Sequence, residues 1–229
     1  MSIQNILLLL AGIINLIMSI LVFSRGIKHN KINRYFSLLT FFNFLWATVL
    51  IFINLGISYE LTRFFASIVY PIALMVVVSL FYFIINFPYK LFELPTIYKS
   101  IINLTMLFYS IFCIFFYKIF VWKVVLTPKV IIYYEFWTYS IYTFILIALM
   151  LVGIVILFLK LKKTENTFKQ PLRLVLIAVI IGTAVGSYSN LFLMYFHNLD
   201  YNYLGPLFTL FINFTAFYLI FLKAKINNS

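Results

Sequence analysis

The sequence predicts an all-α membrane protein, a seven-transmembrane helix bundle with its N-terminus outside and its C-terminus in the cytoplasm. Hydrophobic residues occupy 65% of the 229 positions, and only 10% are charged, whereas soluble domains carry about 25% charged residues. So much apolar surface needs a bilayer as its solvent. Because seven spans and their connections use the whole length, residues 1–229 are expected to form a single transmembrane domain.

Seven apolar segments reach the length of about 20 helical residues that a bilayer core requires. Charges, proline or polar clusters bound each segment. The predicted spans are residues 3–23, 35–55, 64–88, 100–117, 136–159, 174–196 and 204–222. No basic stretch precedes the first span and no small-residue cleavage site follows it, so we expect a retained helix and not a signal peptide.

The positions of lysine and arginine predict the orientation, because these residues resist translocation. Thirteen of the 17 fall in residues 24–34, 89–99, 160–173 and the C-terminal tail, which share one side of the predicted bundle. We expect that side to face the cytoplasm. The asymmetry also explains the net charge of +12. We therefore assign these residues to topology and to contact with anionic lipid, and expect no nucleic-acid partner.

The segment between the fourth and fifth predicted spans has the pattern of a β-hairpin. Residues 119–126 and 130–134 are rich in β-branched and aromatic side chains, and a Thr-Pro-Lys sequence separates them. Lys123 and Lys129 argue against a further span. We expect a short two-stranded lid on the outer face that leans on the helix ends, since an isolated hairpin is only marginally stable. An interfacial helix is the alternative.

The predicted spans lack the side chains of membrane catalysis. The acidic residues and histidines fall in loops or at helix ends; they are Glu60, Glu93, Glu135, Glu165, Asp200, His29 and His197. Intramembrane charges are the usual mark of proton relays, ion-coupled transport and catalysis. No paired carboxylates, metal-ligand cluster or nucleophile–base arrangement can be assembled. The sequence therefore predicts a protein that is not an enzyme, with no cofactor and no metal.

Neutral polar and aromatic residues within the spans are the remaining candidates for a site. They are Asn15, Asn43, Trp46, Tyr70, Asn190 and Asn213. Hydrogen bonding between helices is the simpler interpretation of each asparagine, because an amide in hydrocarbon needs a partner. The alternative is that these residues line a ligand cavity between helices.

The sixth predicted span carries small residues at intervals of four. Ala178, Gly182, Gly186 and Asn190 lie on one helical face. Two glycines at this spacing allow another helix to approach closely. We expect tight packing inside the bundle at both glycines, with homodimerisation as the alternative.

Several short motifs follow one another along the whole chain in a set order. They are Asn15, Asn33-Arg34-x-Phe36 leading to Trp46, Tyr70-Pro71, the hairpin-like segment, Gly186-x-x-x-Asn190-Leu191, and Leu204-Gly205-Pro206-Leu207-Phe208. This order resembles the N-terminal seven-transmembrane sensor region of bacterial histidine kinases. The resemblance implies an N-out bundle in the bacterial cytoplasmic membrane that senses a stimulus and passes it to the cytoplasm.

That family usually continues its last helix into a cytoplasmic output domain. This chain ends at Ser229 and has neither a phosphoacceptor-histidine region nor an ATP-binding motif. We therefore expect a non-enzymatic sensor or receptor-like module that signals through a separate cytoplasmic partner. A small membrane transporter or channel component and a truncated sensor kinase are the alternatives. A transporter would carry internal repeats and broken helices near the midplane, and we find no convincing repeat.

Overall fold

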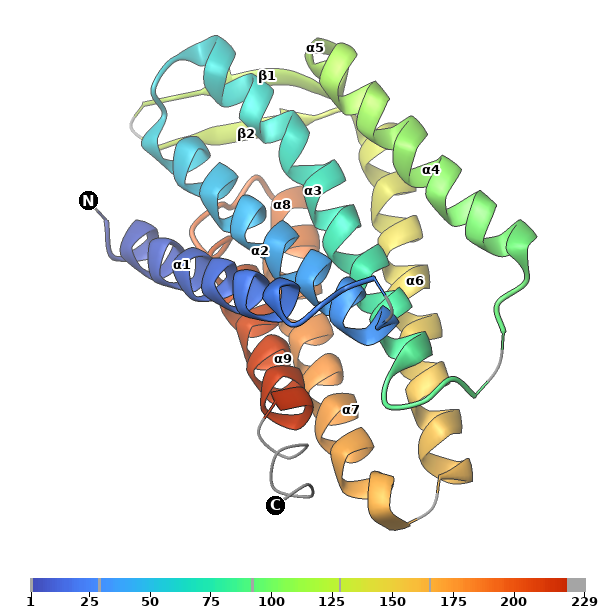
Figure 1. Cartoon of the computed structure of the whole chain (residues 1–229). Helices are drawn as coiled ribbons and strands as arrows, with labels where there is room; N and C mark the ends of the chain where they lie inside the picture. Colours follow the sequence, from blue (N-terminus) through green and yellow to red (C-terminus); the bar gives the residue numbers. More distant parts are fainter. Residues whose placement is uncertain (1, 29, 92, 128, 165, 222–229) are drawn as a thin grey trace.

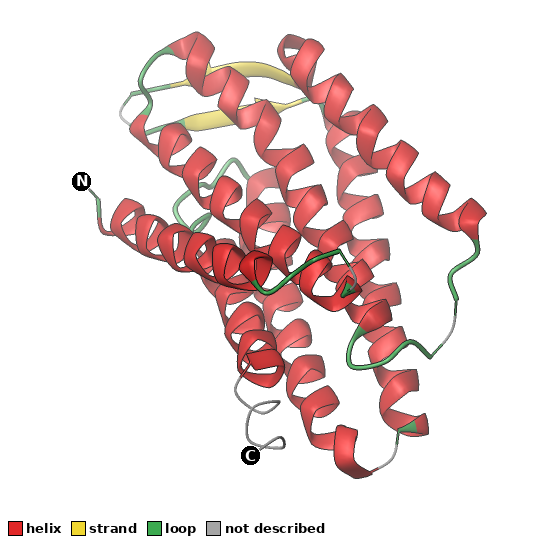
Figure 2. Cartoon of the chain, viewed as in Figure 1, coloured by secondary structure: helices red, strands yellow, loops and turns green. Residues whose placement is uncertain are grey.

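Long helices run through the protein, and a two-stranded sheet covers one end of them (Figure 1). The computed structural model describes residues 2–28, 30–91, 93–127, 129–164 and 166–221. The long helices are α1 (Ile3–Ser24), α2 (Lys31–Leu55), α3 (Tyr59–Asn86), α4 (Thr96–Phe115), α6 (Phe136–Lys163), α7 (Asn166–Ser187) and α9 (Leu204–Phe221). A π-helical turn, η1 (Tyr188–Phe192), and the short α8 (Leu193–Tyr195) continue α7. Figure 2 shows how little of the chain lies outside helices.

Among the described residues, six helical stretches are long and apolar enough to cross a membrane, which confirms an all-α membrane protein. They are α1, α2, α3, α4, α6 and the stretch Phe168–Tyr195. The apolar part of α9, Leu204–Ile220, is shorter and lies at the lower limit of about 17 residues for a span. The last residue of the predicted seventh span, 222, lies outside the described residues.

Several helices begin or end beyond the predicted spans. Helix α2 starts four residues before the predicted 35, because the Asn30 side chain accepts hydrogen bonds from the backbone of Ile32 and Asn33 (3.0 and 3.2 Å). Helices α3 and α4 also start early, and α6 and α7 run into residues 160–173. The predicted spans leave residues 160–173 as a loop between two helices. This prediction is wrong, because most of these residues are helical. Charges mark where a helix leaves hydrocarbon, whereas capping decides where it ends.

The predicted hairpin is confirmed. After the short helix α5 (Tyr117–Phe120), strands β1 (Val121–Val125) and β2 (Ile131–Tyr134) pair antiparallel. The register places Val124 opposite Ile132, with an irregularity nearer the start of β1. Arg63 of α3 donates hydrogen bonds to the carbonyls of Val121 (2.5 Å) and Lys118 (2.7 Å). The hairpin therefore rests on a helix end, as expected for a sheet too small to stand alone.

Helix α3 forms the centre of the bundle. It packs against α2, α4 and α6, while α1 packs on α2 and α9, and α7 packs on α9. Within the apolar 18-residue stretch of α3, 83% of the residues are buried, whereas in the corresponding stretch of α4 17% are buried. The core therefore lies along α3, and α4 stands at the edge, as Figure 1 shows.

Lys160 is a second correction, because the sequence placed it in a cytoplasmic loop. It lies in α6 and is fully buried. Its Nζ donates to the carbonyls of Ile84, Ile85 and Phe87, each at 2.8 Å, and of Tyr89 at 2.7 Å. The last carbonyls of a helix have no partner within the helix and carry partial negative charge. Lys160 satisfies two of these carbonyls of α3, those of Ile84 and Ile85, and so joins α6 to α3.

Candidate functional site

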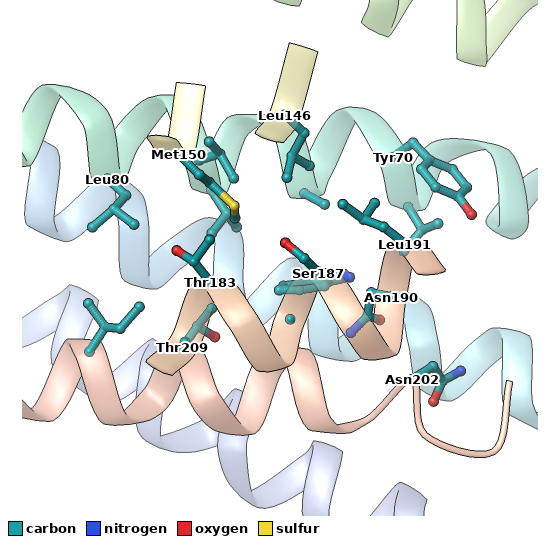
Figure 3. A pocket seen from close by; sticks show the side chains of 18 of the residues that line it. Tyr70, Leu80, Leu146, Met150, Thr183, Ser187, Asn190, Leu191, Asn202 and Thr209 are labelled. Atoms are coloured by element: carbon teal, nitrogen blue, oxygen red, sulfur yellow. The ribbon is translucent and has the colours of Figure 1, made fainter. Parts of the chain in front are cut away.

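A narrow cavity lies in the middle of the bundle, between α2, α3, α6, the α7–α8 stretch and α9 (Figure 3). The volume of the cavity is about 60 Å³, which exceeds the minimum for one buried water. Its lining on α3 extends from Val69 to Leu80, a length of about 16 Å at the rise of a helix. The cavity is therefore long and slender.

Apolar side chains make most of its wall. They include Val76 and Val77 of α3 with Leu146 and Met150 of α6. Ligand sites commonly combine such walls with a few placed polar groups.

An aromatic cluster lies at the end of the cavity nearer the hairpin. The ring of Tyr70 stands edge-on to those of Tyr134, Tyr139 and Tyr142, with centroids 5.0, 5.5 and 4.8 Å away. Such edge-to-face pairs are a favourable arrangement of aromatic rings. Tyr70, a predicted site residue, is 4% exposed. It thus links the cavity to the hairpin, because Tyr134 belongs to β2.

Polar groups gather at the same end, where Figure 3 shows Asn190 and Asn202 on the side of Tyr70. In the orientation that satisfies both of its amide atoms, Asn190 donates to the Asn202 carbonyl (2.9 Å) and accepts from the Gly205 N–H (3.2 Å). A Cβ on Gly205 would overlap the Asn190 amide and lie 2.7 Å from the Trp46 ring. Because Gly205 has no side chain, the start of α9 can approach both Asn190 of η1 and Trp46 of α2.

A chain of amides continues outward from Asn202. Its Nδ2 donates to Asn54 Oδ1 of α2 (3.0 Å), and Asn54 Nδ2 donates to Asn5 Oδ1 of α1 (3.1 Å). Sequence analysis did not select these three residues, because each lies at the edge of a span. The pattern that could have indicated them is an asparagine at the predicted outer end of each of the first, second and last spans.

The π-helical turn at Tyr188–Phe192 places Asn190 and Leu191 in the cavity wall. Tyr139 of α6 donates a hydrogen bond to the Leu191 carbonyl (2.8 Å), so the turn is tied to the opposite wall. Such turns often occur at functional sites. No residue pattern predicts this one, because a π-turn is defined by its backbone hydrogen bonds and not by residue type.

Asn15 and Asn213 form a pair across α1 and α9. Asn213 Nδ2 donates to Asn15 Oδ1 at 2.7 Å, and Asn15 Nδ2 donates to the Ala11 carbonyl at 2.9 Å. Both side chains are fully buried. Asn213 also lines the cavity, whereas Asn15 lies behind it. Hydrogen bonding between helices therefore accounts for Asn15 and for Nδ2 of Asn213, but not for Oδ1 of Asn213.

Among the described residues, eight have buried polar side-chain atoms without a hydrogen-bond partner, and four of these eight are asparagines and a threonine in or near the cavity wall. Both amide atoms of Asn43 are of this kind, as are Thr183 Oγ1, Asn202 Oδ1 and Asn213 Oδ1. Thr183, Asn202 and Asn213 line the cavity. Asn43 is not among the lining residues, although it lies on the α2 face that carries Leu39 and Trp46. An unsatisfied buried polar atom costs about 1–3 kcal/mol, so water or a ligand in the cavity would recover this energy.

The two glycines of α7 differ. A Cβ on Gly182 would lie 2.6 Å from Ile212 Cδ1 and 3.5 Å from the Phe208 carbonyl oxygen, so α9 approaches closely there. A Cβ on Gly186 would meet no atom within 4 Å. The prediction of tight packing at Gly186 is wrong, because this glycine faces the cavity. The four-residue repeat identified a face of the helix but not what lies against each position.

Six of the eight predicted site residues line this one cavity: Trp46, Tyr70, Gly182, Gly186, Asn190 and Asn213. Among the described residues, no three His, Cys, Asp or Glu side chains are placed to hold a metal ion. The cavity has room for water or a small molecular group, and the unpartnered polar atoms in its wall can hydrogen-bond to it. Comparison of the chain with family models, curated proteins and solved structures finds no match.

Proposed function

We propose that this protein is a non-enzymatic membrane receptor or sensor whose ligand occupies the cavity beside α3. The observation that carries the proposal is an apolar cavity whose wall holds the unpartnered polar atoms of Thr183, Asn202 and Asn213. A slender molecule with an apolar body and a hydrogen-bonding end fits this lining. Ligand contact with η1 and α9 on one side and with α3 and α6 on the other would change how these helices pack.

The proposed topology has seven spans, an external N-terminus and a cytoplasmic C-terminus. The division of basic residues, thirteen against four of 17, supports it. Alkaline phosphatase fused after Ser229 should be inactive, and a fluorescent protein fused there should fluoresce. Active phosphatase at this position would contradict the orientation.

The proposed route to the cytoplasm runs through the ends of α6 and α7. Lys162, Lys163 and Lys169 are exposed there, and such a cluster can hold an acidic protein surface. Crosslinking in native membranes should capture a partner, and changing these three lysines to glutamine should weaken capture. The exposed Lys118 and Lys123, which lie at the hairpin end, give the control substitutions. Equal loss with both sets would contradict this route.

The test of the ligand site is the set of small molecules that stays with the purified protein. Mass spectrometry should find one retained species in the wild type. Gly186→Leu, which fills the cavity, should lose it, whereas Ala184→Leu on the exposed face of α7 should keep it. Thermal unfolding of both variants checks that each is folded. Equal retention by the two variants would refute the cavity as the site.

A transporter is the second candidate, and the π-turn favours it. Interrupted helices beside a central site are typical of secondary transporters, and η1 interrupts the α7–α8 stretch next to Asn190. A transporter would move the retained species across proteoliposomes, whereas a receptor would only bind it.

A further inference from the structure

A second hollow lies on the outside of the bundle, between α2, α3 and α4. Its volume is about 310 Å³, and it is open on one side. It exists because α4 packs mainly along α3 across the described residues, with only Tyr109, Ser110 and Cys113 of α4 buried. The space beside α2 is left uncovered. In a membrane this opening faces lipid.

One end of the hollow is polar. Lys99 lies in the first turn of α4, and Asn103 follows one turn later on the same face. The Tyr82 hydroxyl of α3 donates to Asn103 Oδ1 at 3.1 Å. The rings of Tyr82 and Tyr35 stack with centroids 5.1 Å apart. Lysine and tyrosine at the ends of membrane helices are typical of the zone of lipid headgroups.

The rest of the hollow is apolar. Leu38 and Phe42 of α2 and Met106 of α4 line it further along the helices. Residues 35 to 42 of α2 and 99 to 106 of α4 each advance about 10 Å, and both helices run away from the polar end. The lining therefore changes from a cation and hydroxyls to hydrocarbon over about 10 Å, as a phospholipid does.

Positive charge dominates the polar end. The pKa of the Glu93 carboxyl lies below its usual value, first because Lys90 donates a hydrogen bond to it, and then because the charges of Lys90, Lys99 and Lys31 act on it. The charges of three lysines thus act on one carboxylate near this end, and the local charge is positive. Basic pockets between transmembrane helices are known to bind anionic headgroups.

We propose that this hollow binds one anionic phospholipid, with its phosphate at Lys99 and an acyl chain along Phe42 and Met106. Tyr82 and Asn103 supply hydrogen bonds to the headgroup region. The acyl chain fills the open space beside α4 and connects α4 to α2. Few direct contacts between the described residues of these two helices do so. The lipid is thus a structural ligand of the edge of the bundle, separate from the central cavity.

Native mass spectrometry of the purified full-length chain tests the proposal. The probes are phosphatidylglycerol and phosphatidylcholine with identical acyl chains, titrated in the same detergent. One phosphatidylglycerol should bind more tightly than phosphatidylcholine. Lys99→Gln should weaken it about fivefold, the effect of one lysine near an anionic surface. Lys162→Gln removes an exposed lysine outside the hollow and should leave this binding unchanged.

A second pair of variants tests the position of the acyl chain. Met106→Trp fills the apolar part of the hollow, whereas Leu104→Trp enlarges a side chain of α4 that is 62% exposed. Met106→Trp should reduce the bound phosphatidylglycerol and Leu104→Trp should not. The proposal is wrong if both lipids bind equally, if the two lysine variants behave alike, or if Met106→Trp binds as the wild type does. Thermal unfolding confirms that each variant is folded.

Discussion

Helices α3 and α4 are neighbouring apolar helices with opposite surroundings. In α3 the apolar window is 83% buried by protein, and in α4 it is 17% buried. Both read as membrane spans, because lipid and a protein interior are equally apolar. What separates them is the number of neighbours: α3 packs against three long helices, and α4 mainly against α3. Hydropathy therefore finds spans, but it does not distinguish a central helix from an edge helix.

The difference has a physical consequence for substitution. Between helices in lipid, association comes from close packing and hydrogen bonds and not from removal of apolar surface from water. A side chain of α3 that is lost leaves a cavity in protein, whereas one lost from α4 is replaced by lipid. We expect the two helices to differ sharply in tolerance, and the following predictions test this from the largest effect to the smallest.

The largest effect is expected from matched phenylalanines in the two helices. Phe83 of α3 is fully buried, and Phe108 of α4 is 71% exposed. Phe83→Ala should destabilise the protein by about 3–5 kcal/mol, because a cavity remains, and Phe108→Ala should cost less than about 0.5 kcal/mol. Unfolding of purified protein in detergent measures both. Similar losses would mean that α4 is covered in the native protein, for example by a second chain.

Lys160→Ala should destabilise the protein by about 3 kcal/mol, since it leaves the last carbonyls of α3 without their donor and each orphaned group costs about 1–3 kcal/mol. Lys162→Ala, two residues later on the exposed side of α6, is the control and should have little effect. The same unfolding measurement applies. A Lys160→Ala variant as stable as its control would show that water or lipid headgroups replace the ammonium.

The glycines of α7 test the same contrast within one helix. Gly182→Leu should cost about 1–3 kcal/mol by overpacking against Ile212 and α9. Gly186→Leu should cost less, because its side chain enters the cavity. The ratio of folded yields in detergent gives the comparison, and a Gly186→Leu variant that unfolds more readily than Gly182→Leu would contradict the geometry.

The smallest effect concerns a buried hydrogen bond between α3 and α4. Ser67 Oγ donates to the Cys113 carbonyl at 2.7 Å, and both residues are buried. Ser67→Ala should cost about 0.6 kcal/mol, the average for hydrogen bonds between transmembrane helices. Ser110→Ala is the control, because Ser110 donates within its own helix to Met106. A Ser67→Ala variant that loses no more stability than Ser110→Ala would contradict this contribution of the bond.

Much of the site lay within reach of sequence reasoning, although its organisation did not. Trp46, Tyr70 and Asn190 were selected because polar and aromatic groups in hydrocarbon are costly and therefore informative. Thr183 and Asn202 were missed, because a threonine in a helix can bond its own backbone and an asparagine at a span edge can reach water. Whether each amide bonds a helix or lines a cavity depends on its neighbours, as Asn15 and Asn190 show.

Composition and local pattern alone determined that this is a helical membrane protein, where most of its spans lie, and that β-branched runs around Thr-Pro-Lys form a hairpin. These properties depend on the solvent and on residues close in sequence. Only the tertiary structure decided that Lys160 is buried and that η1 and Asn202 meet beside Trp46. It also decided that Gly186 faces the cavity, whereas Gly182 packs closely against α9. The reason is that the burial of a side chain and its hydrogen-bond partners depend on contacts between segments that are distant in sequence. The local residue pattern does not determine which of these segments come into contact.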